Sequence, residues 1–350
     1  MKKMTSEPVL SICISTYNRG EKVEALVRNI LNISSQEMTV VAVDDHSSDD
    51  TAERLSDIQD TRFHFYRNAT NQGARGNWFE TINHGCGQYI LHVLDRDWIY
   101  GEYILALLEV LNKGKISFGY IGRMFNLVNS KKGVIEEYRA GQEALEKFAF
   151  TLIHPSGFLV KKDIWDKLED KKKFFCGESY GIYPHSYVFA CLAKEYNGVL
   201  INYPMIEVIN RATYARYKSK FYEKDKSSLP YWWTPEAHKW ELENLTLYAY
   251  HHMDLRASLL RKILQYRFHE NLHIATIQYR QHAKDPTHVR HYGLKVRYIQ
   301  ETELLKINVE FLWKYIVFLK KNCREILCWD FIRNLIRIGR ENGREILCYR

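Results

Sequence analysis

The chain has 350 residues, a formal net charge of +8, 46% hydrophobic residues and 26% charged residues. This is the composition of a globular protein with one large domain or two ordinary domains. The basic excess favours an acidic partner, such as a nucleotide diphosphate, an anionic membrane or a nucleic acid. The seven cysteines are odd in number and form no C-x-x-C pair, which excludes a disulfide framework and a zinc site of the usual spacing.

We expect no segment that would cross a membrane. Residues 1–8 are polar and lack the apolar stretch of a signal peptide. No run of about 18 uncharged apolar residues occurs, so a spanning helix is not expected either. The sequence therefore predicts a cytoplasmic protein, either free or held on the inner face of the membrane from one side.

The first hundred residues alternate strand and helix patterns. Short apolar runs predict strands at 9–15, 38–43, 63–66 and 89–94. Helices are predicted between them, at 21–33, from the cap residues Ser47, Ser48 and Asp49 to about Ile58, and at 77–83. Strands that are buried on both faces and separated by helices indicate a mostly parallel sheet.

Polar clusters follow three of these strands. Ser15-Thr16-Tyr17-Asn18 ends the first strand, Asp44-Asp45 ends the second, and Asp95-Arg96-Asp97 follows the fourth. Ligands of such sheets bind beyond the carboxyl ends of the strands. Three polar clusters at three strand ends therefore indicate one binding site more strongly than any of them does alone.

The remaining chain divides into two parts. Residues 101–203 continue as mixed α/β, and their predicted elements include a strand at 158–160 and a helix at 186–196. The character changes near residue 211, where a basic loop precedes a predicted helix start at Thr234-Pro235. Long helical segments follow, so we expect a first domain at 1–210 and a mainly helical region at 211–350.

The acidic clusters suit a nucleotide diphosphate with a metal ion. Mg²⁺ and Mn²⁺ take oxygen ligands, and one or two carboxylates suffice where phosphates supply the other oxygens. Asp95 and Asp97 meet this requirement, although a turn that caps the next helix is the alternative. Asp44-Asp45 could accept hydrogen bonds from a base or a ribose, with Thr16, Tyr17 and Asn18 completing the pocket, and an ordinary turn is again the alternative.

Four linked segments resemble family 2 glycosyltransferases of the GT-A fold. They are SICISTYNR (11–19), VVAVDDHSSDDT (40–51), NQGARGN (71–77) and GQYILHVLDRDW (87–98). The resemblance implies an α/β GT-A domain that binds a nucleotide sugar, with 1–100 as its nucleotide-binding half and 101–210 as its acceptor-side half. It also implies an inverting hexosyl- or N-acetylhexosaminyl-transferase that usually needs Mn²⁺ or Mg²⁺.

The resemblance assigns roles by motif position. Ser15, Tyr17 and Asp45 would contact the nucleotide. A second group, from the NQGARGN segment, would shape the donor pocket and reach a phosphate: Asn71, Gly73, Asn77 and Arg75.

Two positions depart from the family pattern. Ser15 stands where many relatives carry proline, which is a small change. Arg96 interrupts the acidic motif, where it would contact a phosphate or a neighbouring acid. By motif position, the resemblance implies Asp97 as the first choice of metal ligand and Asp95 as the second.

An inverting transfer needs a base that deprotonates the acceptor hydroxyl. The family usually places an aspartate of an acidic pair before a helix, and here that place falls near Pro184-His185, without a carboxylate. His185 is the first candidate and Glu178 the second, and for His185 a helix-start or core histidine is the alternative. By position, His154 and Ser156 would lie on the acceptor-side wall.

The substrates follow from the same resemblance. Processive relatives carry a Q-x-x-R-W motif and spanning helices, and this sequence has neither, so we expect one sugar per acceptor. A UDP-sugar is the favoured donor, and the acceptor would be a glycan or a lipid-linked sugar in bacterial surface polysaccharide synthesis.

The C-terminal region is basic and amphipathic. Residues 308–321 and 331–340 mix apolar side chains with lysine and arginine. Basic amphipathic helices can lie on anionic membranes, so 300–350 could contact a membrane surface. The alternative is a helical subdomain that packs on the catalytic domain or joins subunits in a homo-oligomer.

Three other functions are weighed against this one. A nucleotidyltransferase would need a glycine-rich, basic loop after the first strand, and residues 15–20 do not form one. A catalytically degenerate scaffold that binds nucleotide sugars stays an alternative, because the acidic motif is altered. Nucleic acid is not an expected partner, because Asp44-Asp45 and Asp95-Arg96-Asp97 place negative charge where a phosphate polymer would need positive charge.

Overall fold

The computed structural model describes residues 7–123, 133–152, 154–176, 181–208, 234–285 and 297–348. Its internal contacts form two units. The first contains the described residues of 1–140, 154–176 and 195–221, and the second contains those of 141–153, 177–194 and 222–350. The domain boundary that we expect near residue 210 lies outside the described residues and stays a prediction.

The first unit is a sheet with helices. Its elements in chain order are β1 (Leu10–Thr16), α1 (Gly20–Leu31), β2 (Met38–Asp44), α2 (Thr51–Ser56), β3 (Phe63–Arg67), α3 (Gly73–Asn83), β4 (Tyr89–Leu94), β5 (Trp98–Ile99), α4 (Glu102–Leu111), β6 (Phe118–Arg123), β7 (Ile135–Tyr138), β8 (Phe158–Lys161), α6 (Lys162–Lys167), α7 (Lys171–Cys176) and β9 (Gly198–Glu207). The described strands make one nine-stranded sheet in the order β3-β2-β1-β4-β8-β6-β9-β5, with β7 paired to β9.

The sheet is mixed, with a parallel N-terminal half. β1 runs parallel to β2 and β4, and β2 runs parallel to β3. β8 joins β4 to β6 by antiparallel pairing on both sides. The predicted mostly parallel α/β sheet is confirmed, and the carboxyl ends of β1, β2 and β4 therefore meet at one edge of the sheet.

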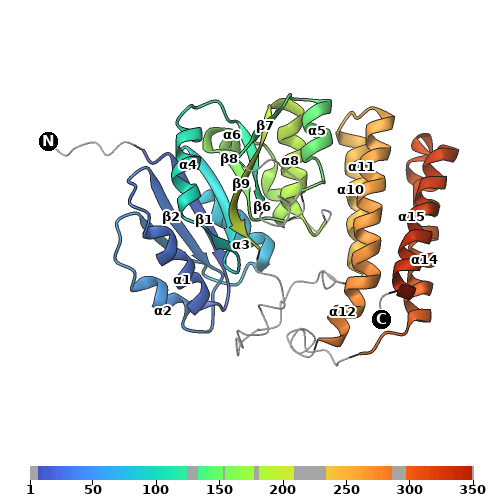
Figure 1. Ribbon diagram of the computed structural model, residues 1–350, viewed down its shortest axis with the longest axis horizontal. Coiled ribbons are helices and arrows are strands. Elements are labelled where there is room, and N and C mark those ends of the chain that lie inside the picture. The colour runs from blue at the N-terminus through green and yellow to red at the C-terminus, as the bar shows by residue number, and fades with distance from the viewer. Residues whose placement is uncertain are drawn as a thin grey trace. The chain divides into compact units, whose positions relative to one another are not determined.

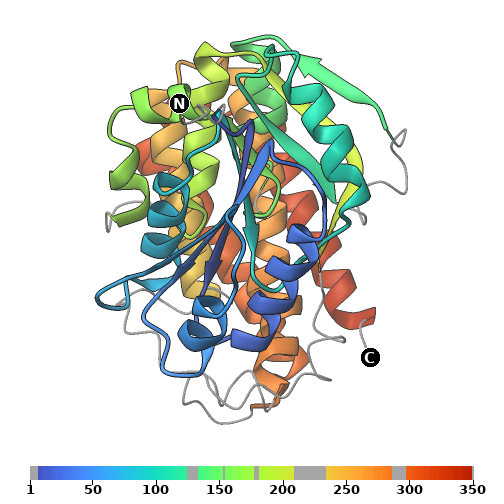
Figure 2. The ribbon, with the colours of Figure 1, turned by 90° about the vertical axis from the view of Figure 1, so that its left-hand side faces the viewer.

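Burial explains why these segments form strands and helices. Every residue of β1 and β2 is buried, as expected for strands that are covered on both faces. The helix α1 buries Val23, Leu26, Val27 and Ile30, which repeat at helical spacing along one face. Figure 2 shows α1 and α2, in blue, in front of the strands of this unit.

The second unit is helical in its described residues. Its elements are α5 (Gln142–Phe148), α8 (Pro184–Glu195), α10 (Pro235–His252), α11 (Ala257–His273), the π-helix η2 (Ile274–Gln278), α12 (Tyr279–Lys284), α14 (Glu301–Asn322), the 3₁₀-helix η3 (Arg324–Ile326) and α15 (Trp329–Cys348). In Figure 1, α10 lies beside α11 and α14 lies beside α15. This confirms the predicted helical C-terminal region.

Local signals in the sequence set several of these helix ends. The hydroxyl of Thr234 accepts a hydrogen bond from the Ala237 N–H at 3.3 Å, and Pro235 is the first residue of α10, so the predicted helix start is confirmed. α12 ends at Lys284, two residues before Pro286 in the sequence. Within the described part of the chain, no helix combines the length and the hydrophobicity that a bilayer crossing requires.

Candidate functional site

The loops that follow β1 and β2 are joined at their backbones. The Asp45 N–H donates to the Thr16 carbonyl at 2.9 Å. The buried side-chain amide of Asn77, on α3, donates to the carbonyls of Thr16 and Val43, each at 3.2 Å. Asn77 therefore fixes the two strand ends relative to each other, a role that is compatible with its predicted place at the donor pocket.

Asp45 is buried at the centre of these loops. Its Oδ1 accepts hydrogen bonds from the Gln72 N–H at 2.7 Å and from the Asn68 side chain at 2.8 Å. Burial raises the pKa of the Asp45 carboxyl above its ordinary value, against these hydrogen bonds, which lower it. Asn71 lies in the same loop, where its side chain accepts a hydrogen bond from the Gly73 N–H at 2.9 Å.

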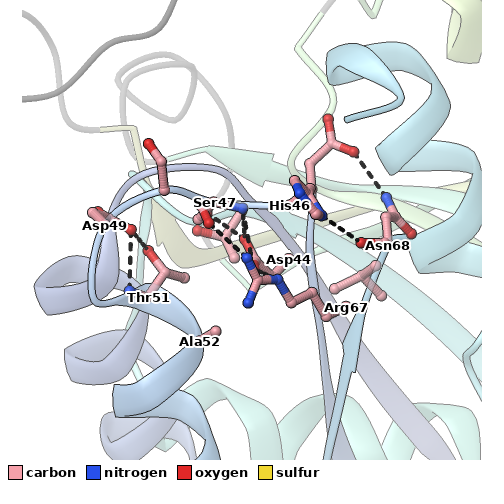
Figure 3. A network of polar contacts seen from close by, with 12 residues as sticks. Asp44, His46, Ser47, Asp49, Thr51, Ala52, Arg67 and Asn68 are labelled. Carbon is pink, nitrogen blue, oxygen red and sulfur yellow. Dashed lines mark hydrogen bonds and ion pairs between the residues drawn. The ribbon is translucent and has the colours of Figure 1, made fainter. Parts of the chain in front are cut away.

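Asp44 anchors the turn that follows β2 (Figure 3). The backbone N–H of Ser47 donates to its two carboxylate oxygens at 3.1 and 3.2 Å, and the Ser47 hydroxyl donates to it as well. The Arg67 guanidinium lies 3.3 Å from Asp44 and also donates to the Ser47 carbonyl at 2.8 Å. These contacts account for Asp44 within the turn, and a contact with a nucleotide stays a prediction.

Asn18 links the loop after β1 to the loop after β2. Its backbone has a φ of 50°, a left-handed conformation that asparagine tolerates better than most residues. Its side-chain oxygen accepts hydrogen bonds from the N–H groups of Ser48 at 2.8 Å and Asp49 at 3.3 Å. Asn18 is buried, so its observed contacts hold the two loops together.

Asp95 is neutralised by an arginine from the first loop. Its Oδ1 accepts from Arg19 at 2.7 Å, and its Oδ2 accepts from the Thr16 hydroxyl at 2.8 Å. The Asp95 side chain is 1% exposed, whereas that of Arg19 is 21% exposed. Our sequence reasoning missed Arg19, although it is the last residue of the STYNR segment that follows β1.

Ser156 and His154 lie beside Asp97. Its Oδ2 accepts a hydrogen bond from the Ser156 hydroxyl at 2.5 Å and lies 3.5 Å from Nε2 of His154. The Ser156 hydroxyl also accepts from the Leu94 N–H at 2.9 Å, which ties it to the end of β4. The two residues predicted for the acceptor-side wall therefore lie directly beside the preferred metal ligand.

The other predicted donor-site residues have more varied surroundings. The Ser15 hydroxyl lies 3.1 Å from Nε2 of His92, beneath the strand end. Arg75 donates to the Phe174 carbonyl at 2.8 Å, so a phosphate would compete with that contact. Tyr17 and Arg96 are partly exposed, and the structure records no hydrogen bond or ion pair between the Arg96 guanidinium and another described residue.

Residues 11–168 match the sequence pattern of glycosyl transferase family 2. This part of the chain belongs to glycosyl transferase family 2. The match contains all three strand-end clusters and the His154 and Ser156 pair beside Asp97. The implied family is therefore confirmed over the part of the chain that forms the site.

Two relatives and one solved structure show how far the similarity extends. A GalNAc(5)-diNAcBac-PP-undecaprenol beta-1,3-glucosyltransferase of Campylobacter jejuni is 27% identical over 183 residues, 50% of this chain and 57% of the relative. Abequosyltransferase RfbV of Salmonella typhimurium is 29% identical over 99 residues, 27% of this chain and 28% of the relative. The chain thus spans little more than half the length of the first of these relatives.

The structural similarity covers nearly the whole chain. TarS 1-349 of S. aureus, in complex with UDP-GlcNAc, superposes with a TM-score of 0.55 at 14% identity, over 97% of this chain and 90% of TarS 1-349. At this identity the similarity shows the fold. The glycosyl transferase family 2 domain therefore has the expected GT-A fold.

The acidic motif of this family 2 domain offers two carboxylates, Asp95 and Asp97, for a divalent cation. Among the described residues no group of three or more His, Cys, Asp and Glu side chains could hold a metal ion alone. A magnesium or manganese site needs only one or two carboxylates when phosphates and water complete it. The Ser156 hydroxyl donates to Asp97, and Arg19 and Thr16 donate to Asp95, so both carboxylates have protein partners and the preference for Asp97 as the metal ligand stays a prediction.

The two candidate bases belong to the other unit. His185 is the second residue of α8 and is 3% exposed. Its ring meets the Tyr183 ring edge-on, with 6.2 Å between centroids. Glu178 lies outside the described residues, so the choice between the two stays a prediction.

Proposed function

We propose that the chain transfers one sugar from a nucleotide sugar, with a UDP-sugar favoured, to a lipid-linked or other glycan acceptor in bacterial surface polysaccharide synthesis. The observation that carries this proposal is the meeting of Asp45, Asp95 and Asp97 with Thr16 and Asn77 at one edge of a family 2 sheet. The name of the Campylobacter relative, which describes a glucosyltransferase acting on an undecaprenol diphosphate glycan, supports the lipid-linked acceptor. The test is hydrolysis or transfer of a nucleotide sugar by the purified chain.

We assign the donor's nucleoside to the loops around Asp45 and its diphosphate to the neighbourhood of Asp97. Asp97 would hold a Mn²⁺ or Mg²⁺ ion together with diphosphate oxygens, and the bound ion would neutralise charge on the departing nucleoside diphosphate. Thr16 and Arg19 hold Asp95 in place at the end of β4, next to this position. The Arg19 guanidinium is partly exposed and can attract a phosphate while it stays paired.

The acceptor must lose a proton as its hydroxyl attacks the anomeric carbon with inversion. We assign this proton to His185, whose neutral imidazole can accept it near neutral pH. Glu178 is the alternative base. The proton goes to the imidazole, the new glycosidic bond forms as the bond to the diphosphate breaks, and the nucleoside diphosphate leaves.

Donor binding should weaken at acid pH because protonation removes the negative charge of Asp45 and turns one of its acceptor oxygens into a donor. Its folded-state pKa is raised by burial, so protonation begins at a higher pH than the ordinary value of 3.8. We expect the rise in melting temperature with UDP-glucose to shrink as the pH falls through this raised pKa. A diphosphate diester is the right probe, because it has no phosphate that titrates near neutral pH.

The matched variant for this pH experiment is Asp45→Asn. It should bind UDP-glucose weakly at every pH, with a loss of about 1–3 kcal/mol that does not depend on acid. The free energy of unfolding depends on pH in the opposite direction. Because burial raises the carboxyl pKa in the folded state, Asp45 stabilises the fold below pH 3.8, and this stabilisation is lost as the pH rises through the folded-state pKa. Wild-type binding that stays constant from neutral to acid pH, in folded protein, would contradict the role of Asp45.

A face of α14 supports the membrane contact that we propose for 300–350. Val309, Trp313 and Val317 are exposed by 62%, 66% and 50%, and they lie at four-residue spacing along the helix. The buried side of the same helix carries Leu304, Phe311, Tyr315 and Leu319 instead. An exposed apolar row with tryptophan at its centre is unusual for a surface that stays in water.

Lysine side chains around this apolar face favour a negatively charged partner. The exposed side chains of Lys306, Lys314, Lys320 and Lys321 lie along the same helix, and Glu310 pairs with the first two. Lysine on both ends of an apolar row suits a leaflet rich in anionic lipid. We therefore propose an anionic membrane surface, where a lipid-linked acceptor would also lie, as the partner of this face.

Flotation with vesicles tests the membrane face. The full chain should float with phosphatidylglycerol vesicles and less with phosphatidylcholine vesicles, and Trp313→Ser with Val317→Ser should reduce binding by about tenfold. Leu105→Ser is the control, because Leu105 is a 48% exposed apolar residue of α4 in the other unit. Equal flotation of the double variant and the wild type would reject this face, and self-association of the wild type without lipid would favour a homo-oligomer instead.

A further inference from the structure

A carboxylate and a guanidinium are buried together between two helices of the second unit. Oε1 of Glu241, on α10, lies 3.5 Å from Nη2 of Arg267, on α11, and the side chains are 1% and 2% exposed. The cost of removing both charges from water offsets much of their attraction, so such a pair adds little to the free energy of unfolding. Apolar residues of similar volume in its place are often equally stabilising or more so. The other contacts of Glu241 and Arg267 therefore indicate a role besides stability.

The pair holds three consecutive residues that precede α8. Oε2 of Glu241 accepts a hydrogen bond from the Ile182 N–H. Gly181 lies so close that a Cβ atom there would overlap the Glu241 carboxylate, so a larger residue at 181 would displace the Glu241 side chain. The Arg267 guanidinium lies over the Tyr183 ring, 5.5 Å from its centroid. One carboxylate and one guanidinium thus fix both the backbone and a side chain of 181–183.

These residues connect directly to His185. The Tyr183 carbonyl accepts the Ser186 N–H at 3.0 Å, which forms the first turn of α8. The Tyr183 ring meets the His185 ring at 77°, so a shift of Tyr183 would move the imidazole. His185 is buried, and its ring position therefore follows the backbone that Glu241 holds.

We propose that Glu241, itself held by Arg267, is a positioning residue that sets the place of His185 for proton transfer. The proposal rests on the proposed function, in which His185 is the base. In this proposal, the C-terminal helices α10 and α11 contribute to catalysis by fixing the residues at the start of α8. A displacement of about 1 Å at a catalytic group can cost about 10²-fold in rate, so a backbone contact of this kind can matter greatly.

The test compares Glu241→Ala with Glu241→Gln. The alanine variant should lower kcat by about 10–10²-fold while the donor KM changes by less than about threefold, because only the base moves. The glutamine variant keeps an oxygen that can accept the Ile182 N–H, and it should recover most of kcat. The alanine variant should also shift the ascending limb of the pH profile of kcat, which a general loss of stability would not do.

Two further measurements make the result unambiguous. Glu243→Ala is the matched control, because Glu243 lies on the same helix in a partly exposed pair with Lys239, and its kcat should stay within about twofold of wild type. Hydrogen exchange of the peptide that contains Ile182 should speed up in Glu241→Ala and stay slow in Glu241→Gln and Glu243→Ala. Folded Glu241→Ala protein with wild-type exchange and wild-type kcat would overturn the proposal. If the wild type turned over no donor, the proposed function would fail, and the exchange at Ile182 would decide the contact by itself.

Discussion

Asp97→Ala should lower kcat/KM for sugar transfer by about 10³-fold, the loss of about 4 kcal/mol expected when a metal that stabilises the departing diphosphate is removed. Asp97 is the buried carboxylate at the end of β4 whose neighbours are the Ser156 hydroxyl and the His154 imidazole. The same variant should lose the rise in melting temperature that UDP with Mn²⁺ produces in the wild type. Differential scanning fluorimetry and initial-rate kinetics measure the two effects.

Asp95→Asn is the matched control for that prediction. It keeps the size of the side chain but breaks the pair with Arg19, so the free energy of unfolding should fall by about 1–3 kcal/mol. The stabilisation by UDP with Mn²⁺ should persist, because Asp97 remains. If Asp95→Asn abolished the metal-dependent shift and Asp97→Ala kept it, the metal assignment would move to Asp95.

His185→Ala should lower kcat by about 10²–10⁴-fold, the contribution of a well-placed general base. Donor affinity should stay within about threefold of wild type, because the proposed role of His185 concerns the acceptor proton. Isothermal titration with UDP and single-turnover transfer assays separate these two quantities. The variant should also flatten the ascending limb of the pH–rate profile.

Two further variants, His269→Ala and Glu178→Ala, test whether His185 is the base. His269 is an exposed histidine of α11 in the same unit, and its loss should leave kcat near the wild-type value. Glu178 is the competing candidate from the sequence. A large loss of kcat in Glu178→Ala, with near-normal turnover in His185→Ala, would transfer the role of base to Glu178.

The sheet could be predicted because its signal is local and strong. The first strand is a short β-rich run, which the structure shifts by one residue to Leu10–Thr16, and the second is an apolar run, which the structure extends by one residue to Met38–Asp44. Their polar ends then had to meet at one edge, since parallel strands share a direction. The general location of the site therefore follows from patterning alone.

The helix boundaries were harder to predict where glycine or capping residues carried a second role. Ser47, Ser48 and Asp49 all have the side chains of helix caps, but the Ser47 hydroxyl binds Asp44, and α2 begins later, at Thr51, whose N–H donates to Asp49 at 3.0 Å. The helix α3 begins at Gly73, before the predicted start at 77. The prediction was late because the first turn of α3 contains two glycines, which are typical of a loop. Gly73 has a φ of 73°, which explains why glycine is present at that start.

Contacts between distant segments could not be predicted at all. No spacing in the sequence indicates that Arg19 pairs with Asp95, or that Ser156 donates to Asp97. The contact of Glu241 with Ile182 joins a C-terminal helix to a loop fifty-nine residues earlier. These pairs depend on the packing of whole elements, whereas the residue types that they use are ordinary for turns and helix surfaces.

The central claim is best tested by donor hydrolysis with the purified chain, using UDP-, GDP- and dTDP-sugars with Mn²⁺ and with a chelator. We expect turnover of at least one UDP-sugar with Mn²⁺, and loss of that turnover with the chelator or in Asp97→Ala. Binding of a UDP-sugar without any turnover, in hydrolysis or with lipid-linked acceptors, would favour a nucleotide-sugar-binding scaffold. The absence of both binding and turnover with every donor would contradict the proposed function.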